Sequence, residues 1–498
     1  MRGRLATQQA RLFSSRATIC YSVASLLTSP LTDGIAIFTS LRGLRFCIIY
    51  DIMRICACVP NEAQFAGFIM DKSIYDCYVN ILKSELLSAL GCTEPIAVAY
   101  AAALARDTLG ELPERVEISV SGNILKNVKG VVVPHTDGLK GIDAAASAGI
   151  IAGNADKELE CISGASRSDL ERIRHYLHTT EFSIAQSDSG CIFDIFVRVY
   201  AGGHSAGVRI VGHHTNVVRI EKDGQAVLDC CASADEASCC PEYDLLRIAD
   251  ILAFADEAEI NDVREALERQ IEYNSAIAEE GLKNDYGARV GKLLLKNFGN
   301  DIHNVAKATA AAGSDARMNG CTMPVVIVSG SGNQGMTASL PVIVFAKHLG
   351  SSHEELLRAL VVSNLVTVRL KARIGRLSAY CGAVSAGCGA AAGVCKLRGG
   401  SASEISHAIV NAIAIDSGII CDGAKSSCAA KIASAVEAGL IGMEMALSGT
   451  NFSGGDGILV DSVEGTIDNV GDLARDSMRE IDETIIKLMI KNRRENIA

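Results

Sequence analysis

The sequence has no tryptophan and few other aromatic residues: its 498 residues include 12 Phe, 11 Tyr and no Trp. It also lacks an excess of basic residues, because 58 Asp and Glu outnumber 47 Lys and Arg and give a net charge of −11. Single-stranded nucleic acids are bound by aromatic stacking and basic grooves, and duplexes by Lys and Arg. We therefore predict a protein that binds neither nucleic acid nor an acidic membrane surface.

No long hydrophobic run suits a bilayer, although hydrophobic residues make up 49% of the chain. The uncharged stretch 318–346 contains the segment Ser329–Gly335, whose polar side chains and loose backbone would not be tolerated in hydrocarbon. The stretch 377–395 is rich in Ala, Gly, Ser and Cys, which suits a helix packed tightly inside a protein. We predict no transmembrane helix.

The 18 cysteines include no Cys-x-x-Cys spacing, which excludes zinc ribbons and ferredoxin-type motifs. The chain also has no clear secretory signal, so we do not expect a disulfide framework. Cysteines in a long chain of this kind serve as core residues, metal ligands or nucleophiles. Their positions must therefore identify the functional ones.

Residues 1–69 differ in composition from the rest, because they contain seven Arg, no Lys and only three acidic residues. Arg-rich, acid-poor N-termini resemble organelle transit peptides. The alternative, which we favour, is that translation starts at Met70, where a helical pattern begins at once. In either case we predict that this N-terminal extension does not belong to the fold. The expected location is cytoplasmic, or organellar if residues 1–69 are a transit peptide.

From Met70 onward the pattern predicts an α+β fold in two domains. Residues 70–305 are expected to form an α+β domain with an antiparallel β-meander, and residues 306–498 a mostly α-helical domain rich in small residues. Hydrophobic periodicity and turn signals place the elements. The expected helices are 71–90, 96–106 and 143–153, followed by helices within 243–297 and 348–492; the expected strands are 116–120, 192–200, 208–211, 217–221 and 325–328.

Cys381, Cys388 and Cys395 recur every seven residues along one expected helix. On a continuous helix seven residues advance about 10 Å, which is too far for neighbouring thiolates to share one compact metal centre. Cysteine is also a common small residue in tightly packed Ala/Gly helices. Spacing alone therefore leaves metal ligation and simple packing both open.

Cys421 and Cys428 are again seven residues apart, but an Asp-Gly turn signal follows Cys421. Ser426 or Ser427 is a suitable N-cap, so we expect Cys421 in a loop and Cys428 in the first turn of a helix. This arrangement would bring the two sulfur atoms together at a positive helix end, where thiolates are favoured.

Two strand ends carry the same Ser-Gly-Asn sequence. The first includes Ser121 and Asn123, and the second includes Asn333 and Gln334. Together the two loops could present amide side chains and backbone N–H groups to one small polar ligand. Ordinary turn chemistry explains either loop taken singly.

Five ordered motifs resemble the L-cysteine desulfidase family, which is related to the α chain of iron–sulfur-dependent L-serine dehydratase. The resemblance runs from about Met70 to the C-terminus. The motifs are Gly91-Cys-Thr-Glu-Pro-Ile-Ala-Val-Ala99, Val120-Ser-Gly-Asn-Ile124, Ser-Gly-Asn-Gln-Gly335, Gly375-Arg-Leu-Ser-Ala-Tyr-Cys-Gly382 and Ile420-Cys-Asp-Gly-Ala-Lys425.

The resemblance implies a [4Fe–4S] cluster held by three cysteines, with one iron left open for substrate. The family's ligand positions fall on Cys381, Cys421 and Cys428. Cys388 is the rival for the first position, although the motif favours Cys381. The chain departs from the family where His135 follows Val-Pro, which puts a substrate contact at that loop in doubt.

Cys92 matches a further functional cysteine of the family. It precedes a helix opened by Pro95, so the helix dipole is expected to lower the pKa of its thiol and fit it for general-base catalysis. The alternative is a buried structural thiol. The residues that we predict to bind substrate are Ser121, Asn123, Asn333 and Gln334, with Arg376 and Lys425 as carboxylate partners. His204, His213 and His214 lie in or beside turns of the meander, where solvent-facing histidines are common, and we assign them no role.

The implied reaction is a carbon–sulfur lyase reaction that converts L-cysteine and water to pyruvate, ammonia and hydrogen sulfide. The nearest alternative is dehydration of L-serine on the same scaffold. A different class of function is a non-catalytic, cysteine-rich metal or redox sensor, which would leave the motif at Cys92 unexplained. The expected binding partner is a small-molecule substrate. Self-association into a homo-oligomer is left open.

Overall fold

The computed structural model describes residues 70–230 and 241–495 of the chain. The predicted N-terminal extension, residues 1–69, lies outside the described residues. From Met70 onward the described residues form one compact unit. They combine an N-terminal part that contains a largely antiparallel sheet with a mostly helical C-terminal part, so the predicted α+β fold class is confirmed.

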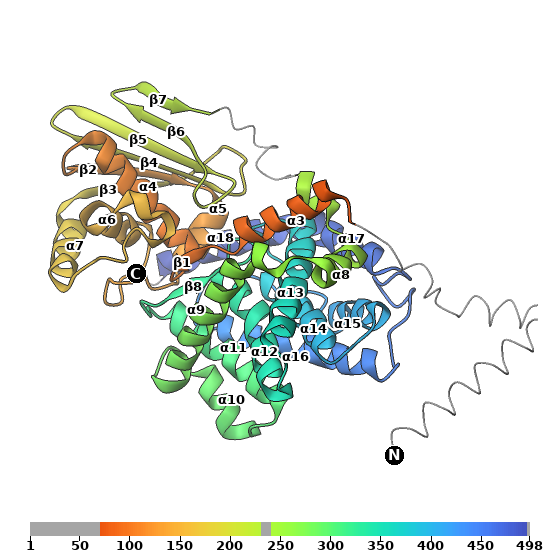
Figure 1. Ribbon diagram of the computed structural model, residues 1–498. Helices are drawn as coiled ribbons and strands as arrows, with labels where there is room; N and C mark the ends of the chain where they lie inside the picture. The colour runs from red at the N-terminus through yellow and green to blue at the C-terminus, as the bar shows by residue number, and fades with distance from the viewer. Residues whose placement is uncertain (1–69, 231–240, 496–498) are drawn as a thin grey trace, which may run out of the picture. The chain divides into compact units, whose positions relative to one another are not determined.

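A six-stranded sheet forms the N-terminal part (Figure 1). Its spatial order is β3-β2-β4-β5-β6-β7, and every neighbouring pair is antiparallel except β2 and β3. The predicted meander is thus present, whereas β3 had no signal because most of its side chains are exposed and do not alternate. The strands are β2 (Arg115–Val120), β3 (Glu181–Gln186), β4 (Asp194–Ala201), β5 (His204–Val211), β6 (Val217–Lys222) and β7 (Gln225–Asp229).

Helix α4 (Thr93–Leu109) packs against β4 and β5 of this sheet, and α6 (Ile142–Ala152) packs against α4. The contact between the two helices is close because Gly149 carries no side chain: a Cβ atom built there would lie 2.0 Å from the backbone oxygen of Ala99. Alanine is the commonest residue of both helices. The small residues of this region therefore let α4 and α6 pack with their backbones close together. The remaining elements of this part are α5 (Gly122–Val128), η2 (Ala155–Glu160) and α7 (Arg167–Thr179).

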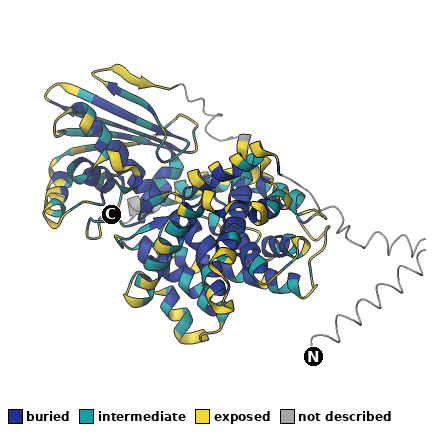
Figure 2. Cartoon of the chain, viewed as in Figure 1, coloured by how far each residue is buried: buried dark blue, intermediate teal, exposed yellow. Residues whose placement is uncertain are grey.

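The C-terminal part is built of helices whose inner members are buried along most of their length (Figure 2). Helix α14 lies against α12, α13, α15 and α16, and its buried face consists of Ala, Gly, Val, Ser and Cys. The helices are α8 (Ile248–Glu257), η4 (Ile260–Asp262), α9 (Arg264–Lys283), α10 (Val290–Phe298), α11 (Ile302–Met318), α12 (Gly332–Leu349), α13 (His353–Ile374), α14 (Gly382–Leu397), α15 (Ala402–Ile415), α16 (Cys428–Leu447), α17 (Val463–Asp472), η5 (Leu473–Ser477) and α18 (Arg479–Glu495).

A short two-stranded ribbon joins the beginning of the described chain to the helical part. Helix α3 (Lys72–Glu85) is followed by β1 (Ser88–Leu90), which pairs antiparallel with β8 (Pro324–Val326). The predicted helix 71–90 therefore ends earlier than expected. The predicted domain boundary at residues 305 and 306 falls inside α11, so the division of residues 70–498 into two domains stays a prediction.

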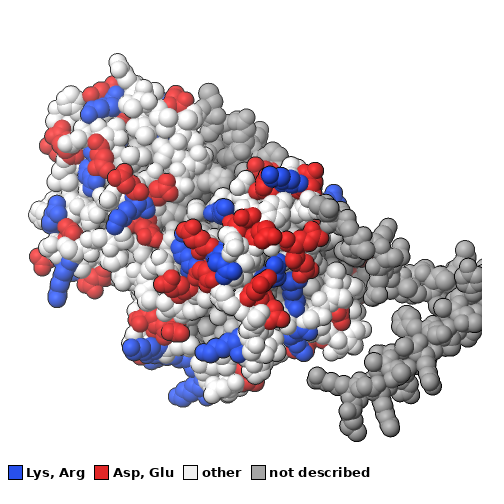
Figure 3. Space-filling view, in the orientation of Figure 1, with Lys and Arg blue, Asp and Glu red and all other residues white. Residues whose placement is uncertain are grey.

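Charged side chains of both signs intermingle on the face shown in Figure 3. Many of them form local ion pairs, as Arg358 does with Glu354 and Lys396 with Asp256. Among the described helices, none is both long enough and apolar enough to cross a membrane.

Candidate active site

Four helices begin around one inner cavity of about 90 Å³ in the described part of the chain. Cys92 is the N-cap of α4, Ser331 that of α12 and Cys381 that of α14, while Cys428 is the first residue of α16. All four residues line the cavity. Because the N-terminus of a helix carries a partial positive charge, this arrangement favours anions and thiolates inside the cavity.

Three cysteines form one wall of the inner cavity: Cys381, Cys421 and Cys428. The loop before α16 is held beside the loop before α14 by backbone hydrogen bonds, in which Cys421 N donates to Ala379 O at 2.6 Å and Cys381 N donates to Ile419 O at 2.9 Å. These bonds fix the two loops side by side. The predicted placement of Cys421 in a loop and Cys428 in the first helical turn is present in the structure.

The charges around this wall favour a thiolate at Cys421. A hydrogen bond from Cys381 lowers the pKa of Cys421 to about 5, with help from Lys126 and Lys371, although burial acts in the opposite direction. The same hydrogen bond and burial raise the pKa of Cys381, and burial raises that of Cys428. In the protein without metal, the wall therefore holds one thiolate and two thiols.

The cysteine wall suits an iron–sulfur cluster better than a single ion. Within residues 70–230 and 241–495, no three Cys, His, Asp or Glu side chains are placed to bind one metal ion. In a cluster each cysteine binds a different iron atom, so no single ion has to be reached by all three sulfur atoms. Three thiols that line one cavity, with Lys126 and Lys371 to offset negative charge, supply the donor set for such a cluster.

Cys92 and Glu94 form a buried pair that lines the same cavity. The Cys92 thiol donates to Glu94 Oε2 at 3.0 Å, and Asn127 Nδ2 donates to Glu94 Oε1 at 2.9 Å. Burial and the Glu94 carboxylate raise the pKa of Cys92 well above its ordinary value. The expectation that the helix dipole lowers this pKa is therefore wrong, because desolvation and the adjacent carboxylate outweigh the dipole.

Glu94 is ionised despite its burial. Burial by itself would raise the pKa of Glu94, but His214, the Cys92 hydrogen bond and Arg317 together hold it below the ordinary value. Burial lowers the pKa of His214 to about 4, so at neutral pH His214 is uncharged and the hydrogen bond and Arg317 carry the effect. The cavity thus contains a carboxylate that can accept a proton.

The two Ser-Gly-Asn segments differ in what they present to the cavity. Asn333 and Gln334 line it, and among the described residues no partner forms a hydrogen bond with Asn333 Oδ1 or Gln334 Oε1, which are both buried. Ser121 is not among the lining residues; its hydroxyl donates to Ile192 O at 2.8 Å. Asn123 does not line the cavity either, and one turn further along α5 Asn127 takes that place. Sequence reasoning missed Asn127, because nothing in its own neighbourhood distinguishes it.

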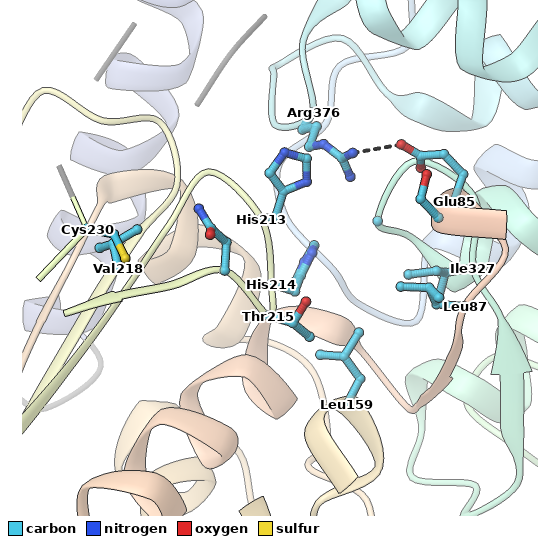
Figure 4. A pocket seen from close by; sticks show the side chains of 13 residues that line it. Glu85, Leu87, Leu159, His213, His214, Thr215, Val218, Cys230, Ile327 and Arg376 are labelled. Atoms are coloured by element: carbon cyan, nitrogen blue, oxygen red, sulfur yellow. Dashed lines mark hydrogen bonds and ion pairs between the residues drawn. The ribbon is translucent and has the colours of Figure 1, made fainter. Parts of the chain in front are cut away.

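The cations that the sequence suggested as carboxylate partners are both paired within the protein. Arg376 lines the cavity, but its Nη2 donates to Glu85 Oε1 at 2.7 Å (Figure 4). Lys425 forms an ion pair with Asp422 and does not line the cavity. Sequence reasoning missed Lys371 of α13, which lines the cavity and whose pKa burial lowers to about 8.

The remaining candidates lie away from the inner cavity. Cys388 is buried inside α14 and does not line it, whereas its rival Cys381 does. His135 has a left-handed backbone, with φ of 58°, and is likewise not among the lining residues. The structure therefore brings together Cys92, Asn333, Gln334, Arg376, Cys381, Cys421 and Cys428, and leaves out Ser121, Asn123 and Lys425.

An outer cavity of about 650 Å³ adjoins the inner one, and His214 and Arg376 line both. Figure 4 shows His213 and His214 on the loop between β5 and β6, facing Glu85 and Arg376. His214 packs edge-on against Phe193 at 4.7 Å between ring centroids, and its Nε2 is buried without a partner. The expectation of solvent-facing histidines is therefore wrong for His214, because the loop between β5 and β6 places this residue in the site.

Comparison with known proteins shows which family the chain resembles. Residues 156–487 match the serine dehydratase alpha chain family, and this segment contains the three cysteines of the wall but not Cys92. A UPF0597 protein of Desulfitobacterium hafniense is 54% identical over 416 residues, which cover 84% of this chain and 97% of that protein. UPF0597 proteins of Lachnoclostridium phytofermentans and Treponema denticola are 50% and 42% identical; the matches cover 84% and 85% of this chain and 100% of each relative.

The match to the family spans most of the described chain, and the relatives are covered almost completely. The family predicted from the five sequence motifs is thereby confirmed. The protein belongs to the serine dehydratase alpha chain family.

Proposed function

We propose that this protein is an iron–sulfur-dependent lyase that converts L-cysteine and water to pyruvate, ammonia and hydrogen sulfide. The observation that carries the proposal is the inner cavity, which is lined both by three cysteines and by the buried Cys92–Glu94 pair. Membership of the serine dehydratase alpha chain family supports a lyase.

Cys381, Cys421 and Cys428 would hold a [4Fe–4S] cluster. With three protein ligands, the bound cluster would supply one iron without a cysteine ligand, a Lewis acid suited to a thiolate leaving group. The surroundings of the cysteine wall favour binding of such a cluster, because four helix N-termini and two lysines offset the negative charge of the thiolates.

Glu94 and Cys92 would handle the protons. The sulfur of Cys92 would remove the proton from Cα of the substrate as its own thiol proton passes to Glu94, so that no free thiolate has to form against the raised pKa of Cys92. The electron pair of the Cα–H bond forms the Cα–Cβ double bond, and the sulfur leaves with the electrons of the Cβ–S bond. The protonated Glu94 can return its proton to the departing sulfide. The enamine that remains is hydrolysed to pyruvate and ammonia.

Asn333 and Gln334 would orient the substrate at the start of α12. Their buried side-chain oxygens have no partner in the described chain, so each can accept a hydrogen bond from the substrate's ammonium group. Gly382 leaves room for Gln334 in this position, because a Cβ atom at residue 382 would lie 2.5 Å from the Gln334 amide carbon.

L-Serine is the second candidate substrate, because the matching family is that of the serine dehydratase alpha chain. The same proton transfers would then expel water instead of sulfide. Assays of pyruvate from L-cysteine and from L-serine, on one anaerobically reconstituted sample, decide between the two. A higher kcat/KM for L-serine would reverse our assignment, and iron binding without turnover of either would favour a sensor.

The test of the cluster uses two matched cysteine variants. Cys421→Ala removes a thiolate from the cavity wall and is expected to abolish both the visible sulfur-to-iron absorption and the pyruvate formation. Cys388→Ala removes a buried thiol from the same region but not from the wall, and is expected to keep both. Full iron and sulfide content in Cys421→Ala would refute the assignment of the wall.

A further inference from the structure

Lys371 is a buried cation in the last turn of α13 that faces the inner cavity. It is 3% exposed. Throughout the described residues, no carboxylate forms an ion pair with its ammonium group, and no acceptor receives a hydrogen bond from it. Burying an ammonium group without a hydrogen-bonded partner is unfavourable, and the Cys421 thiolate, which acts on Lys371 through charge alone, offsets that cost only in part. An anion that enters the cavity would remove this penalty.

Most other cations near the site already have anionic partners; Arg317, whose Nη2 has no hydrogen-bond partner among the described residues, does not line the cavity. Arg376 pairs with Glu85, Lys425 and Lys431 pair with Asp422, and Lys126 pairs with Asp482. A substrate carboxylate could bind any of these only by displacing a protein carboxylate. Lys371 requires no such displacement.

The groups that face Lys371 also indicate which end of a substrate would lie there. The two cysteines that raise its pKa, Cys421 and Cys381, belong to the cysteine wall. The carboxylate of the cavity, Glu94, belongs to the pair with Cys92 and suits the substrate's ammonium group. A zwitterionic amino acid therefore finds a cation and a carboxylate on separate residues.

We propose that Lys371 binds the α-carboxylate of the substrate and thereby restricts the enzyme to amino acids with a free α-carboxylate. This inference rests on the proposed function, since it assumes an α-amino acid in the inner cavity. Lys371 is then a substrate-binding residue that the sequence motifs do not contain. The alternative role, a counter-ion needed only to hold the cluster, predicts a different result in the experiment below.

The experiment compares L-alanine with L-alaninamide as ligands of the full-length, anaerobically reconstituted protein. Neither has a leaving group, both carry an ammonium group at neutral pH, and only L-alanine has a carboxylate. Binding is measured by calorimetry, which does not depend on turnover, and by competition with L-cysteine. The variants are Lys371→Met and Lys371→Gln, and the control is Lys396→Met, which removes a lysine of α14 that pairs with Asp256 outside the cavity.

The wild-type protein and the control should bind L-alanine about ten- to a hundredfold more tightly than L-alaninamide, as a charge-assisted hydrogen bond would give. Lys371→Met should bind both ligands equally, at the level of the amide, and keep the visible spectrum of the cluster. Lys371→Gln serves the same purpose if the methionine variant does not fold. Retention of the wild-type preference in either variant, or loss of the cluster spectrum in both, would overturn the proposal.

The calorimetric result also separates this inference from the proposed function. If neither L-cysteine nor L-serine is converted, the proposed lyase activity fails, while a preference for L-alanine that depends on Lys371 still stands. If L-cysteine is converted but wild type binds the two ligands equally, the lyase stands and the role of Lys371 fails.

Discussion

At the scale of single residues, the chemistry of the site depends on how burial changes each side chain. Cys92 lies at a helix N-terminus, where a lowered thiol pKa is the usual expectation. In the fold it is 2% exposed and its thiol donates to Glu94, so its pKa rises instead. The thiol can still act in catalysis, because its hydrogen-bond partner is a carboxylate that can take its proton.

The first prediction concerns this pair. Cys92→Ala should keep the cluster spectrum and lower kcat by about 10²–10⁴-fold, the usual contribution of general-base catalysis. Glu94→Gln should have a similar effect, since an amide cannot accept the thiol proton. The double variant should be little worse than either single one, because the two residues act as a unit. Cys161→Ala, which removes a buried thiol away from the cavity, is the control. Near-normal pyruvate formation by Cys92→Ala would reduce Cys92 to a structural thiol.

The second prediction concerns stability. Asp315 of α11 accepts a hydrogen bond from Gly291 N at 3.1 Å, but its buried Oδ1 has no partner in the part of the chain that the structure describes, and burial raises its pKa from 3.8 to about 6. The folded state therefore holds the proton more tightly than the unfolded state does. The resulting penalty is absent below about pH 4, grows as the pH rises and is complete above about pH 6.

Asp315→Asn removes the charge and keeps an acceptor for Gly291. It should raise the free energy of unfolding by about 1–3 kcal/mol above pH 6 and leave it unchanged below pH 4. Urea unfolding of both proteins at several pH values measures the difference. An effect of the same size at pH 4 and pH 8 would show that ionisation of Asp315 is not its cause.

At the scale of elements, glycine decides how closely helices approach in the C-terminal part. A Cβ atom at Gly387 of α14 would lie 2.4 Å from the backbone oxygen of Ala435 in α16. One at Gly382, the first residue of the same helix, would lie 2.5 Å from the amide carbon of Gln334. The first clash is with backbone, which resists movement, and the second is with a flexible side chain.

The third prediction follows from this difference. Gly387→Ala should destabilise the protein by about 1–3 kcal/mol, because α14 and α16 must move apart. Gly382→Ala should leave thermal stability nearly unchanged but displace Gln334, and so lower kcat/KM by at least about tenfold. Thermal unfolding and steady-state kinetics on the two variants provide the comparison. Equal losses of stability would contradict the distinction between backbone and side-chain contact.

At the scale of the whole molecule, the inner cavity brings together residues from segments far apart in the sequence. Cys92 begins α4 beside the sheet, Asn333 begins α12, and Cys381 and Cys421 come from loops of the helical part. The β1–β8 ribbon ties the first of these segments to the second. The site therefore exists only when the N-terminal and helical parts fold together.

The fourth prediction concerns the N-terminal extension. A chain that starts at Met70 should be soluble, melt at the same temperature and have the same kcat/KM as the full chain, because residues 1–69 differ in composition and every site residue follows Met70. The match to the relative from Treponema denticola covers 100% of that protein but only 85% of this chain, which supports the expectation. Aggregation of the shortened protein would show that the extension stabilises the fold.

The sequence by itself determined the family, the order of most helices and strands, and the cysteines at 381, 421 and 428 as the candidate ligands. These inferences depend on local signals: periodicity, turn residues, N-caps and contiguous motifs. The strand β3 was not predicted, because its exposed side chains do not alternate with buried ones. The strand β1 was not predicted, because its three residues are too few to show a periodic pattern.

Only the tertiary structure decided which of the candidate residues share one cavity. It left out Ser121, Asn123 and Lys425, and it added Glu94, Asn127, His214 and Lys371. It also reversed the expected shift in the pKa of Cys92. The physical reason is the same in each case: which side chains meet, and which charges are desolvated together, depends on contacts between distant segments that no local pattern of the sequence records.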